Sequence, residues 1–528
     1  MFLASVAILS SLSQAEWPKT KAESSGFLET STYADVIGFI EELQSVSTCV
    51  QVETMGFSAE GRAMPLVIAS RPPVTSAVEA RRAGKAVIYI QANIHAGEVE
   101  GKEAALHLLR RYCQEKKGVL DKAVLLVAPI YNADGNEKFG PQSRNRPGQG
   151  GPEMVGQRAN GQGLDLNRDY IKAETPEFLG ALAHVYRRWD PELMMDLHTT
   201  DGTRHGYALT YAPPLNPGTP DEIEHYARDV MMPAIRKQMR QRYGIETFDY
   251  GNTENRDGKT AWYEVGPEGR YSTNYAGLRN RFGILSEALT YLPFKRRIEV
   301  TEKFTDLVIN WTVKNSAEIV GRCRKADATV VAWGLDPATA PQLGLRFEPG
   351  LRGVETLLIE KSSAKKEGPP KDLERVTMPV FDRFVPTLTS AFPFAYILPG
   401  NNVKLSNLLV NHGVRVERLK QDAVVSAFMF STSKVTRASQ EFQRHKFVTL
   451  EGSFVERDIT VTKGMMIVRT AQPLGVLAFH ILEPLGTDGA VAWNFLDPDS
   501  EVPHLAKLMK RVPLVTEGVG LLPAISRD

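Results

Sequence analysis

The sequence predicts an α/β protein: a mixed, mostly parallel sheet sandwiched by helices, followed by a smaller β-rich α/β domain. Apolar, β-branched runs of strand length alternate with segments whose apolar residues recur at helical spacing. These runs are continuously apolar, which is typical of strands buried on both faces. Beyond about residue 325 the strands become shorter, rich in Val and separated by Pro and Gly turns. We therefore expect two domains, spanning residues 30–320 and 325–528.

The elements of the first domain follow one another in strand and helix order. We expect strands at 85–94, 123–135, 192–202 and 282–291, and helices at 100–113, 174–189 and 299–315. A long loop at 140–163, rich in Gly, Pro, Asn and Gln, interrupts this order. A loop of that length inside a domain is usually functional. In such sheets, binding sites gather at the carboxyl ends of the strands.

The second domain contains three recognisable segments. Residues 395–419 predict a small β-α-β element, and residues 454–470 predict short strands. The charged, proline-containing stretch 361–372 is typical of a surface loop or linker. The sequence does not indicate a role for this domain.

The composition excludes several classes of protein. The chain has 528 residues, of which 42% are hydrophobic and 24% charged, as in a globular protein with a real core. Lys and Arg number 63 against 62 Asp and Glu, and a net charge of +1 provides no global field to hold a nucleic acid. Three cysteines are too few for a disulfide framework or a Cys-rich metal site. Any metal must therefore be held by His and carboxylates.

The first fifteen residues are typical of a signal peptide. Residues 2–12 form an apolar stretch of suitable length, and Ser13 and Ala15 supply the small residues of a cleavage site. The usual basic start is missing, so a frayed or truncated N-terminus is the alternative. No later uncharged apolar run reaches the ~20 residues of a transmembrane helix. We expect a signal peptide at 1–15, a secreted or periplasmic protein, and no membrane span in the mature chain.

Two His-x-x-Glu motifs offer zinc-ligand chemistry. His95 and Glu98 lie at the end of a predicted buried strand, where both side chains can turn toward one point outside the sheet. His480 and Glu483 lie inside an apolar, strand-like run without other ionisable residues, and we interpret His480 as a structural core residue. The first motif is therefore the candidate metal site.

Further polar motifs follow the first one at the ends of strands or in the long loop. They are Gly163-Leu164-Asp165-Leu166-Asn167-Arg168, Asp196-Leu197-His198 and Leu285-Ser286-Glu287-Ala288. Their order and spacing resemble the zinc carboxypeptidase family over about residues 30–315. In that family a third His ligand follows the first motif by about a hundred residues, and here His198 follows His95 by 103. Asp196 matches no family role, and we regard it as structural.

The resemblance implies a metal site and its partner. One zinc ion per chain would be held by His95, Glu98 and His198, with the fourth position left for water or substrate. Asp165 would accept a hydrogen bond from the first His ligand and so fix its tautomer.

The resemblance also implies substrate-binding and catalytic residues. Asn167 and Arg168 would bind the C-terminal carboxylate of the substrate, because a guanidinium matches a carboxylate in two hydrogen bonds. Glu287 would act as the general base and acid, since partial burial raises a carboxyl pKa toward a working value.

Two further roles in the family's site, those of an oxyanion-stabilising arginine and a substrate-binding tyrosine, each have several candidate residues. We favour Arg158 for stabilising the oxyanion and Tyr275 for binding the substrate, although a core position is equally compatible with Tyr275. The other candidates are Arg144, Arg146, Tyr263 and Tyr271.

The resemblance therefore implies a zinc metallocarboxypeptidase acting on a peptide or peptide-like substrate with a free C-terminal carboxylate. The alternatives are an amidohydrolase for muropeptides or N-acyl amino acids, and a catalytically silent relative that only binds carboxylates. A phosphate loop is excluded at 97–102, and the Gly-x-Ser-x-Gly and His-Glu-x-x-His motifs are absent. Too few residues precede residue 30 for a folded pro-domain, so we expect activity without further processing. The sequence does not indicate an oligomeric state.

Overall fold

The computed structural model describes residues 16–519, apart from 364–365 and 367. The expected signal peptide, residues 1–15, lies outside the described residues. Within them, every helix is too short or too polar to cross a bilayer.

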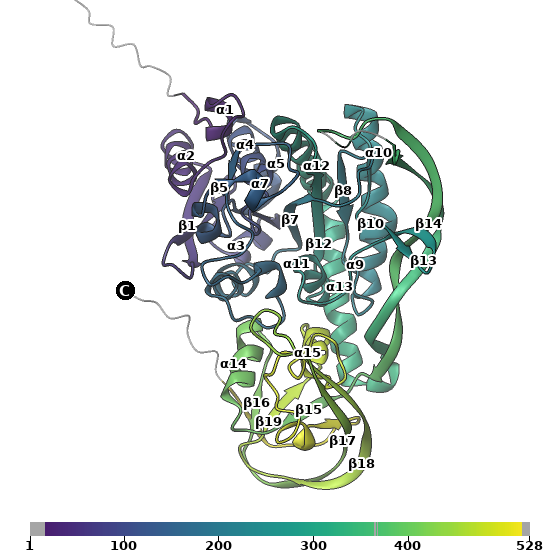
Figure 1. Ribbon diagram of the computed structural model, residues 1–528. Coiled ribbons are helices and arrows are strands. Elements are labelled where there is room, and N and C mark those ends of the chain that lie inside the picture. Colours follow the sequence, from purple (N-terminus) through teal and green to yellow (C-terminus); the bar gives the residue numbers. More distant parts are fainter. Residues whose placement is uncertain (1–15, 364–365, 367, 520–528) are drawn as a thin grey trace, which may run out of the picture.

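An eight-stranded sheet forms the centre of the first part of the chain (Figure 1). Its strands, in spatial order, are β1 (Val50–Phe57), β2 (Ala63–Ala69), β4 (Ala123–Ala128), β3 (Ala86–Ala92), β7 (Leu193–Thr200), β12 (Phe282–Leu289), β8 (Leu209–Ala212) and β9 (Thr247–Asp249). The four central strands, from β4 to β12, are parallel to one another, and antiparallel pairs flank them on both sides. The predicted α/β class with a mixed sheet is confirmed.

Helices cover both faces of this sheet, which explains why its central strands read as continuous apolar runs. One face is covered by α2 (Tyr33–Val46), α4 (Glu100–Gln114), α10 (Met232–Tyr243) and α12 (Phe294–Lys314). The other is covered by α3 (Ala77–Arg82), α8 (Pro176–Ala181), the π-helical turn Leu182–Tyr186 and α11 (Ser272–Leu278). The short helices are α1 (Lys21–Ser24), α5 (Val119–Lys122), α6 (Ala133–Glu137), α7 (Gln142–Asn145) and α9 (Asp221–His225), which continues into the π-helical turn Tyr226–Met231.

Some predicted elements have different bounds in the structure. The strand expected at 123–135 ends at Ala128, because Asn132 caps a new helix by accepting a hydrogen bond from the backbone of Gly135. The helix expected at 174–189 begins after the N-cap Thr175 and changes to π-helical geometry at Leu182. The long loop 140–163 contains the short pair β5 (Gly140–Pro141) and β6 (Met154–Val155).

The second part of the chain adds two sheets. A long hairpin of β13 (Gln342–Glu360) and β14 (Leu373–Ala391) pairs with β10 (Asn252–Arg256) and β11 (Lys259–Tyr263) of the first part. A seven-stranded sheet has the order β18 (Val448–Val461), β17 (Ala423–Arg437), β20 (Ala506–Leu508), β15 (Ala395–Leu398), β19 (Met466–Arg469), β16 (Glu417–Leu419) and β21 (Thr516–Gly518). The expected β-α-β element is present as β15, α14 (Val403–His412) and β16.

One hydrophobic core joins the two parts. The long helix α13 (Ser316–Leu335) runs without a break through the boundary expected at 320–325. A single buried cluster includes Tyr89 and Met194 of the central sheet together with Tyr396 and Leu477 of the second part. The second part therefore packs on α11 and the turn Leu182–Tyr186, which cover one face of the central sheet (Figure 1).

His480 lies in a helix, α15 (Gly475–Leu482), and the expectation of a strand there is wrong. An uninterrupted apolar run does not distinguish a short buried helix from a strand. The ring of His480 is largely buried, and burial lowers its pKa to about 4. In contrast to expectation, Glu483 has ionisable neighbours. Its carboxylate lies against Lys507 and accepts a hydrogen bond from the Tyr396 hydroxyl at 2.6 Å.

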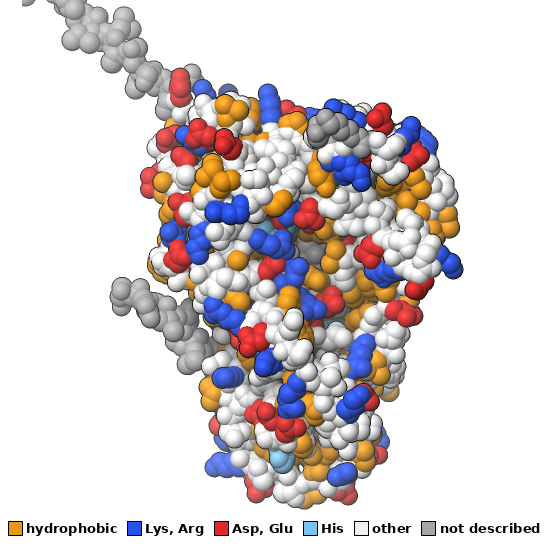
Figure 2. Space-filling view, in the orientation of Figure 1, with side chains coloured by type: hydrophobic (Ala, Val, Ile, Leu, Met, Phe, Trp, Pro, Cys, Tyr) orange, Lys and Arg blue, Asp and Glu red, His pale blue; other side chains and the backbone are white. Residues whose placement is uncertain are grey.

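Charged side chains of both signs are interspersed over the face seen in Figure 2. No large field of one sign covers this face, in keeping with the net charge of +1.

The N-terminal segment is held to α4 by a histidine between two carboxylates. His107 on α4 lies with its Nε2 3.5 Å from Glu23 and its Nδ1 3.5 Å from Glu302. Burial alone would lower the pKa of His107, but hydrogen bonds to Glu23 and Glu302 raise it to about 9.

This histidine makes stability dependent on pH. Because its folded-state pKa of about 9 exceeds the ordinary value of 6.5, protonated His107 stabilises the fold fully below pH 6.5. That stabilisation is lost as the pH rises through 9. We expect the free energy of unfolding, measured with urea, to fall by at most about 3 kcal/mol across this window. His107→Gln should flatten the dependence; an unchanged slope in the variant would contradict this assignment.

Candidate active site

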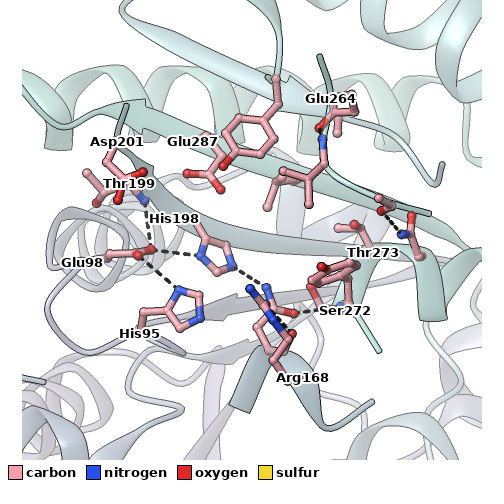
Figure 3. Close-up of a pocket in the computed structure, with 18 of the residues that line it drawn as sticks. His95, Glu98, Arg168, His198, Thr199, Asp201, Glu264, Ser272, Thr273 and Glu287 are labelled. Atoms are coloured by element: carbon pink, nitrogen blue, oxygen red, sulfur yellow. Dashed lines mark hydrogen bonds and ion pairs between the residues drawn. The ribbon is translucent and has the colours of Figure 1, made fainter. Parts of the chain in front are cut away.

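Three potential metal ligands converge at the carboxyl ends of the neighbouring strands β3 and β7 (Figure 3). His95 and Glu98 lie in the turn between β3 and α4, and His198 lies near the end of β7. The Nδ1 atoms of both histidines face the Glu98 carboxylate, His95 at 3.1 Å and His198 at 2.9 Å. One ligand atom from each residue lies within 4.8 Å of the others, and all three side chains are buried. The structure thus brings together the three residues that the family resemblance implies as ligands.

Close packing of α4 against β7 brings the cluster together. A Cβ atom at Gly101, in the first turn of α4, would lie 2.7 Å from the Leu197 Cβ and 3.1 Å from its carbonyl oxygen. Only glycine allows this approach without displacing the strand. Since Gly101 follows Glu98 by three residues and Leu197 precedes His198, the contact sets the separation of these two side chains.

A second carboxylate orients each histidine. The Nε2 of His95 lies 3.0 Å from Asp165, and the Nε2 of His198 lies 2.9 Å from Asp196. A carboxylate at one ring nitrogen fixes the tautomer and makes the other nitrogen a better metal ligand. Asp196 is fully buried and also accepts a hydrogen bond from Gln91 at 3.2 Å. The residue that we regarded as structural therefore contacts a candidate metal ligand.

The donor set fits a zinc ion. Two imidazole nitrogens and one carboxylate, with the remaining ring nitrogens facing carboxylates, are the chemistry that catalytic zinc sites use. These donors open onto a cavity of about 470 Å³, which leaves room for water or a substrate group.

Asn167 and Arg168 line the same cavity. They lie in a 3₁₀ turn, Leu166–Arg168, which Asp165 caps by accepting the Asn167 N–H at 2.9 Å. The Asn167 side chain is fixed by a hydrogen bond from the Ser272 N–H at 3.0 Å, and the Arg168 guanidinium lies 4.7 Å from the centroid of the Tyr271 ring. Both polar groups are therefore held at the cavity wall by neighbours on α11 and the residue before it.

Glu287 lies near the end of β12, directly opposite His198 on β7 in the strand register. Its side chain is buried and lines the cavity. Burial, together with the neighbouring Glu98 carboxylate, raises the pKa of Glu287 to about 8, although His198 and Arg146 act in the opposite direction. A carboxyl group with such a pKa is suited to accept and return a proton near neutral pH.

Two of the three candidate arginines reach the cluster. Arg158 contacts Glu98 at 3.3 Å and Asp165 at 3.0 Å, and Arg146 lies 3.5 Å from Glu98. Both line the cavity. The side chain of Arg144 is directed elsewhere, with its Nε 3.1 Å from Asn145. Arg158 and Arg146 therefore both lie beside the ligand cluster at the cavity wall.

The structure does not bring Tyr275 to the cavity. Its ring is fully buried, and its hydroxyl contacts His412 at 2.8 Å and Arg279 at 3.1 Å. The physical reason is the helix α11, which begins at Ser272 and turns Tyr275 toward the core. Tyr271, just before the helix, and Tyr250 line the cavity instead. Tyr263 stacks on Phe381 at 4.8 Å.

Sequence reasoning also missed Glu264, a buried residue that lines the cavity. Burial raises its pKa well above the ordinary value, and the nearby Asp382, Asp249 and Glu287 add to this rise. One of its oxygens accepts the Val265 N–H at 2.8 Å. Its place depends on β11 pairing with the distant strand β14, and no local motif indicates that pairing.

Comparisons with known proteins show a family to which part of this chain is similar. Residues 36–181 match the family model of the zinc carboxypeptidases, a span that includes His95, Glu98, Asn167 and Arg168. This match confirms the resemblance to the zinc carboxypeptidases that the motifs indicate.

Individual relatives are similar over most of the chain. Carboxypeptidase 2 of Trichophyton rubrum is 22% identical over 484 residues, which cover 87% of this chain and 83% of that protein. Among solved structures, a metallo-carboxypeptidase from Burkholderia cenocepacia has a TM-score of 0.40 and 15% identity, covering 55% of this chain and 70% of that one. The carboxypeptidase A from Helicoverpa armigera has a TM-score of 0.37 and 17% identity, covering 55% and 74%.

The ligand cluster predicts which histidines hold a metal. We expect His95→Ala and His198→Ala to lower the zinc content of the purified protein well below one ion per chain, because each change removes one of three protein ligands. His225→Ala, at a side chain that is 56% exposed, is the control. Elemental analysis is the measurement, and full zinc content in both cluster variants would refute the assignment.

Proposed function

We propose that this protein is a zinc-dependent metallocarboxypeptidase that hydrolyses the C-terminal peptide bond of peptides or peptide-like substrates. One observation carries the proposal: the potential metal ligands, a carboxylate-binding pair and a buried carboxyl group line one cavity. His95, Glu98 and His198 would hold one zinc ion. When bound, zinc supplies Lewis acidity, which polarises the scissile carbonyl and makes the attacking water more acidic.

Arg168 and Asn167 would bind the free carboxylate of the substrate. The Arg168 guanidinium is stacked on Tyr271 and the Asn167 amide is fixed by Ser272, so little side-chain freedom is lost when a substrate binds. A guanidinium donates two parallel hydrogen bonds to a carboxylate. Such a site selects the end of a chain over its interior.

Glu287 would act as general base and then as general acid. Its raised pKa favours uptake of a proton from the attacking water, and the same carboxyl group then returns that proton to the leaving amine. Arg158 would stabilise the negative charge that develops on the carbonyl oxygen, with Arg146 as the second candidate for this role. The presence of Glu287 in the cavity argues against a relative that only binds carboxylates.

We also infer export to the periplasm or the medium. This inference is supported by the sequence of residues 1–15 alone, with its apolar stretch and small residues at the candidate cleavage site. N-terminal sequencing of the exported protein tests it, with cleavage expected after Ala15.

The role of Glu287 predicts a separation of catalysis from metal binding. We expect Glu287→Gln to keep its zinc while kcat falls by at least ~10²-fold, because the amide preserves the shape but cannot accept a proton. Steady-state hydrolysis of a blocked dipeptide, together with elemental analysis, provides both values. Near-normal turnover would refute this role for Glu287.

The role of Arg168 predicts a dependence on the free carboxylate. The wild-type enzyme should release the last residue of a peptide acid and act poorly on the matching C-terminal amide. Arg168→Ala should raise the KM for the acid about 10- to 100-fold, because a charge-assisted hydrogen-bonded pair is lost. If acid and amide are cleaved equally by the wild-type protein, the exopeptidase assignment fails.

A further inference from the structure

The second part of the chain contacts the loop that carries the carboxylate-binding pair. We call residues 162–174 the binding loop, because it contains Asp165, Asn167 and Arg168. The turn that joins β17 to β18, residues 438–447, reaches this loop and is named here the tip hairpin. These segments are more than 260 residues apart in the sequence, so only the packing of the two parts brings them together.

Consecutive residues of the tip hairpin bond to the binding loop. The Gln443 Oε1 accepts the backbone N–H of Asp165 at 2.9 Å, and the Arg444 guanidinium donates to the carbonyl oxygen of Gln162. The His445 Nε2 lies 2.7 Å from the Glu174 carboxylate. The hairpin therefore contacts the binding loop near its start, at Asp165 and at its end.

The backbone of the tip hairpin is strained at the residues that make these contacts. Gln443 and Arg444 have φ of 53° and 65°, and Phe442 and His445 exchange backbone hydrogen bonds on either side of them. A two-residue turn with two positive φ angles favours Asn and Gly. Other residues there cost on the order of 1 kcal/mol each. The long side chains of Gln443 and Arg444 are thus present in spite of their backbone conformation.

Two other contacts from the second part of the chain hold the binding loop and the adjacent residue Arg270. The His412 Nε2 lies 2.9 Å from the Ile171 carbonyl oxygen. Asp488 accepts the N–H of Arg270 at 2.6 Å, directly before Tyr271, on whose ring Arg168 lies. Residues of the second part therefore contact the binding loop and also Arg270, the residue before the tyrosine on whose ring the Arg168 guanidinium lies.

We propose that the second part of the chain positions the substrate-carboxylate site, and that Gln443 is a positioning residue for the binding loop. The inference rests on the proposed function in so far as Asn167 and Arg168 bind substrate. By holding the Asp165 N–H, Gln443 sets the start of the turn from which Asn167 and Arg168 reach the cavity. Asp165 in turn contacts His95 at 3.0 Å and Arg158 at 3.0 Å.

A glycine substitution separates this role from a merely structural one. Gln443→Gly removes the acceptor but relieves the positive φ, so the melting temperature should stay equal or rise. The KM for a peptide acid should nevertheless rise about three- to tenfold, the effect of one hydrogen bond, with kcat within about twofold. Gln443→Glu, which keeps an acceptor oxygen at the same place, should restore most of the KM. Gln440→Gly, at an exposed residue of the same hairpin, is the matched control.

Hydrogen exchange provides a readout that does not depend on peptidase activity. In the full-length protein, amides of residues 162–174 should exchange at least about fivefold faster in Gln443→Gly than in the wild type, and Gln440→Gly should show wild-type rates. Equal exchange in this loop, or an equal KM rise in the control, would overturn the inference. A wild-type protein that binds zinc but releases no C-terminal residue would overturn the proposed function, and the exchange comparison would still decide the positioning role.

Discussion

The buried carboxylate of Glu98 is the group around which the cavity is organised. An unpaired buried charge is costly, and this one is satisfied from all sides. His95 contacts one oxygen, while His198 and the Thr199 N–H, at 3.1 Å, contact the other. Two guanidinium groups complete the shell. Together these neighbours keep the pKa of Glu98 well below its ordinary value despite its burial. The long loop, β7 and the end of β3 all converge on this one side chain.

The cavity combines groups with opposite protonation preferences within a short distance. Glu98 and Asp165 face imidazoles and guanidiniums, and their pKa values are lowered. Glu287 and Glu264, on the side formed by β12 and the segment after β11, are buried near other carboxylates, and their pKa values are raised. Carboxyl groups thus supply anions at one part of the cavity and proton-accepting or neutral groups at another; Glu98, Glu287 and Glu264 are labelled in Figure 3.

The sequence predicts the fold class and much of the candidate site, because both depend on strong local signals. Buried parallel strands read as apolar runs, and the residues that follow their carboxyl ends are brought together by topology alone. His95, Glu98, His198 and Glu287 meet in this way. The position of Asp196 beside His198 can also be predicted, because side chains two residues apart in a strand lie on the same face.

The parts of the candidate site that the sequence does not predict depend on contacts between segments distant in the sequence. The choice among arginines requires the path of the loop 140–163, and the position of Tyr275 requires the first residue of α11. Glu264 and Gln443 reach their places through strand pairing and packing with residues more than 100 positions away. A short apolar run such as that around His480 has no period that separates a helix from a strand.

The hydrophobic core shared between the two parts has a consequence for cooperativity. Because Tyr89 and Met194 pack in the same buried cluster as Tyr396 and Leu477, neither part can lose its structure without exposing apolar surface of the other. Two domains joined by a linker would melt as two transitions, whereas this chain should melt as one. The central sheet and the segment that follows it in sequence should thus unfold as a single cooperative unit.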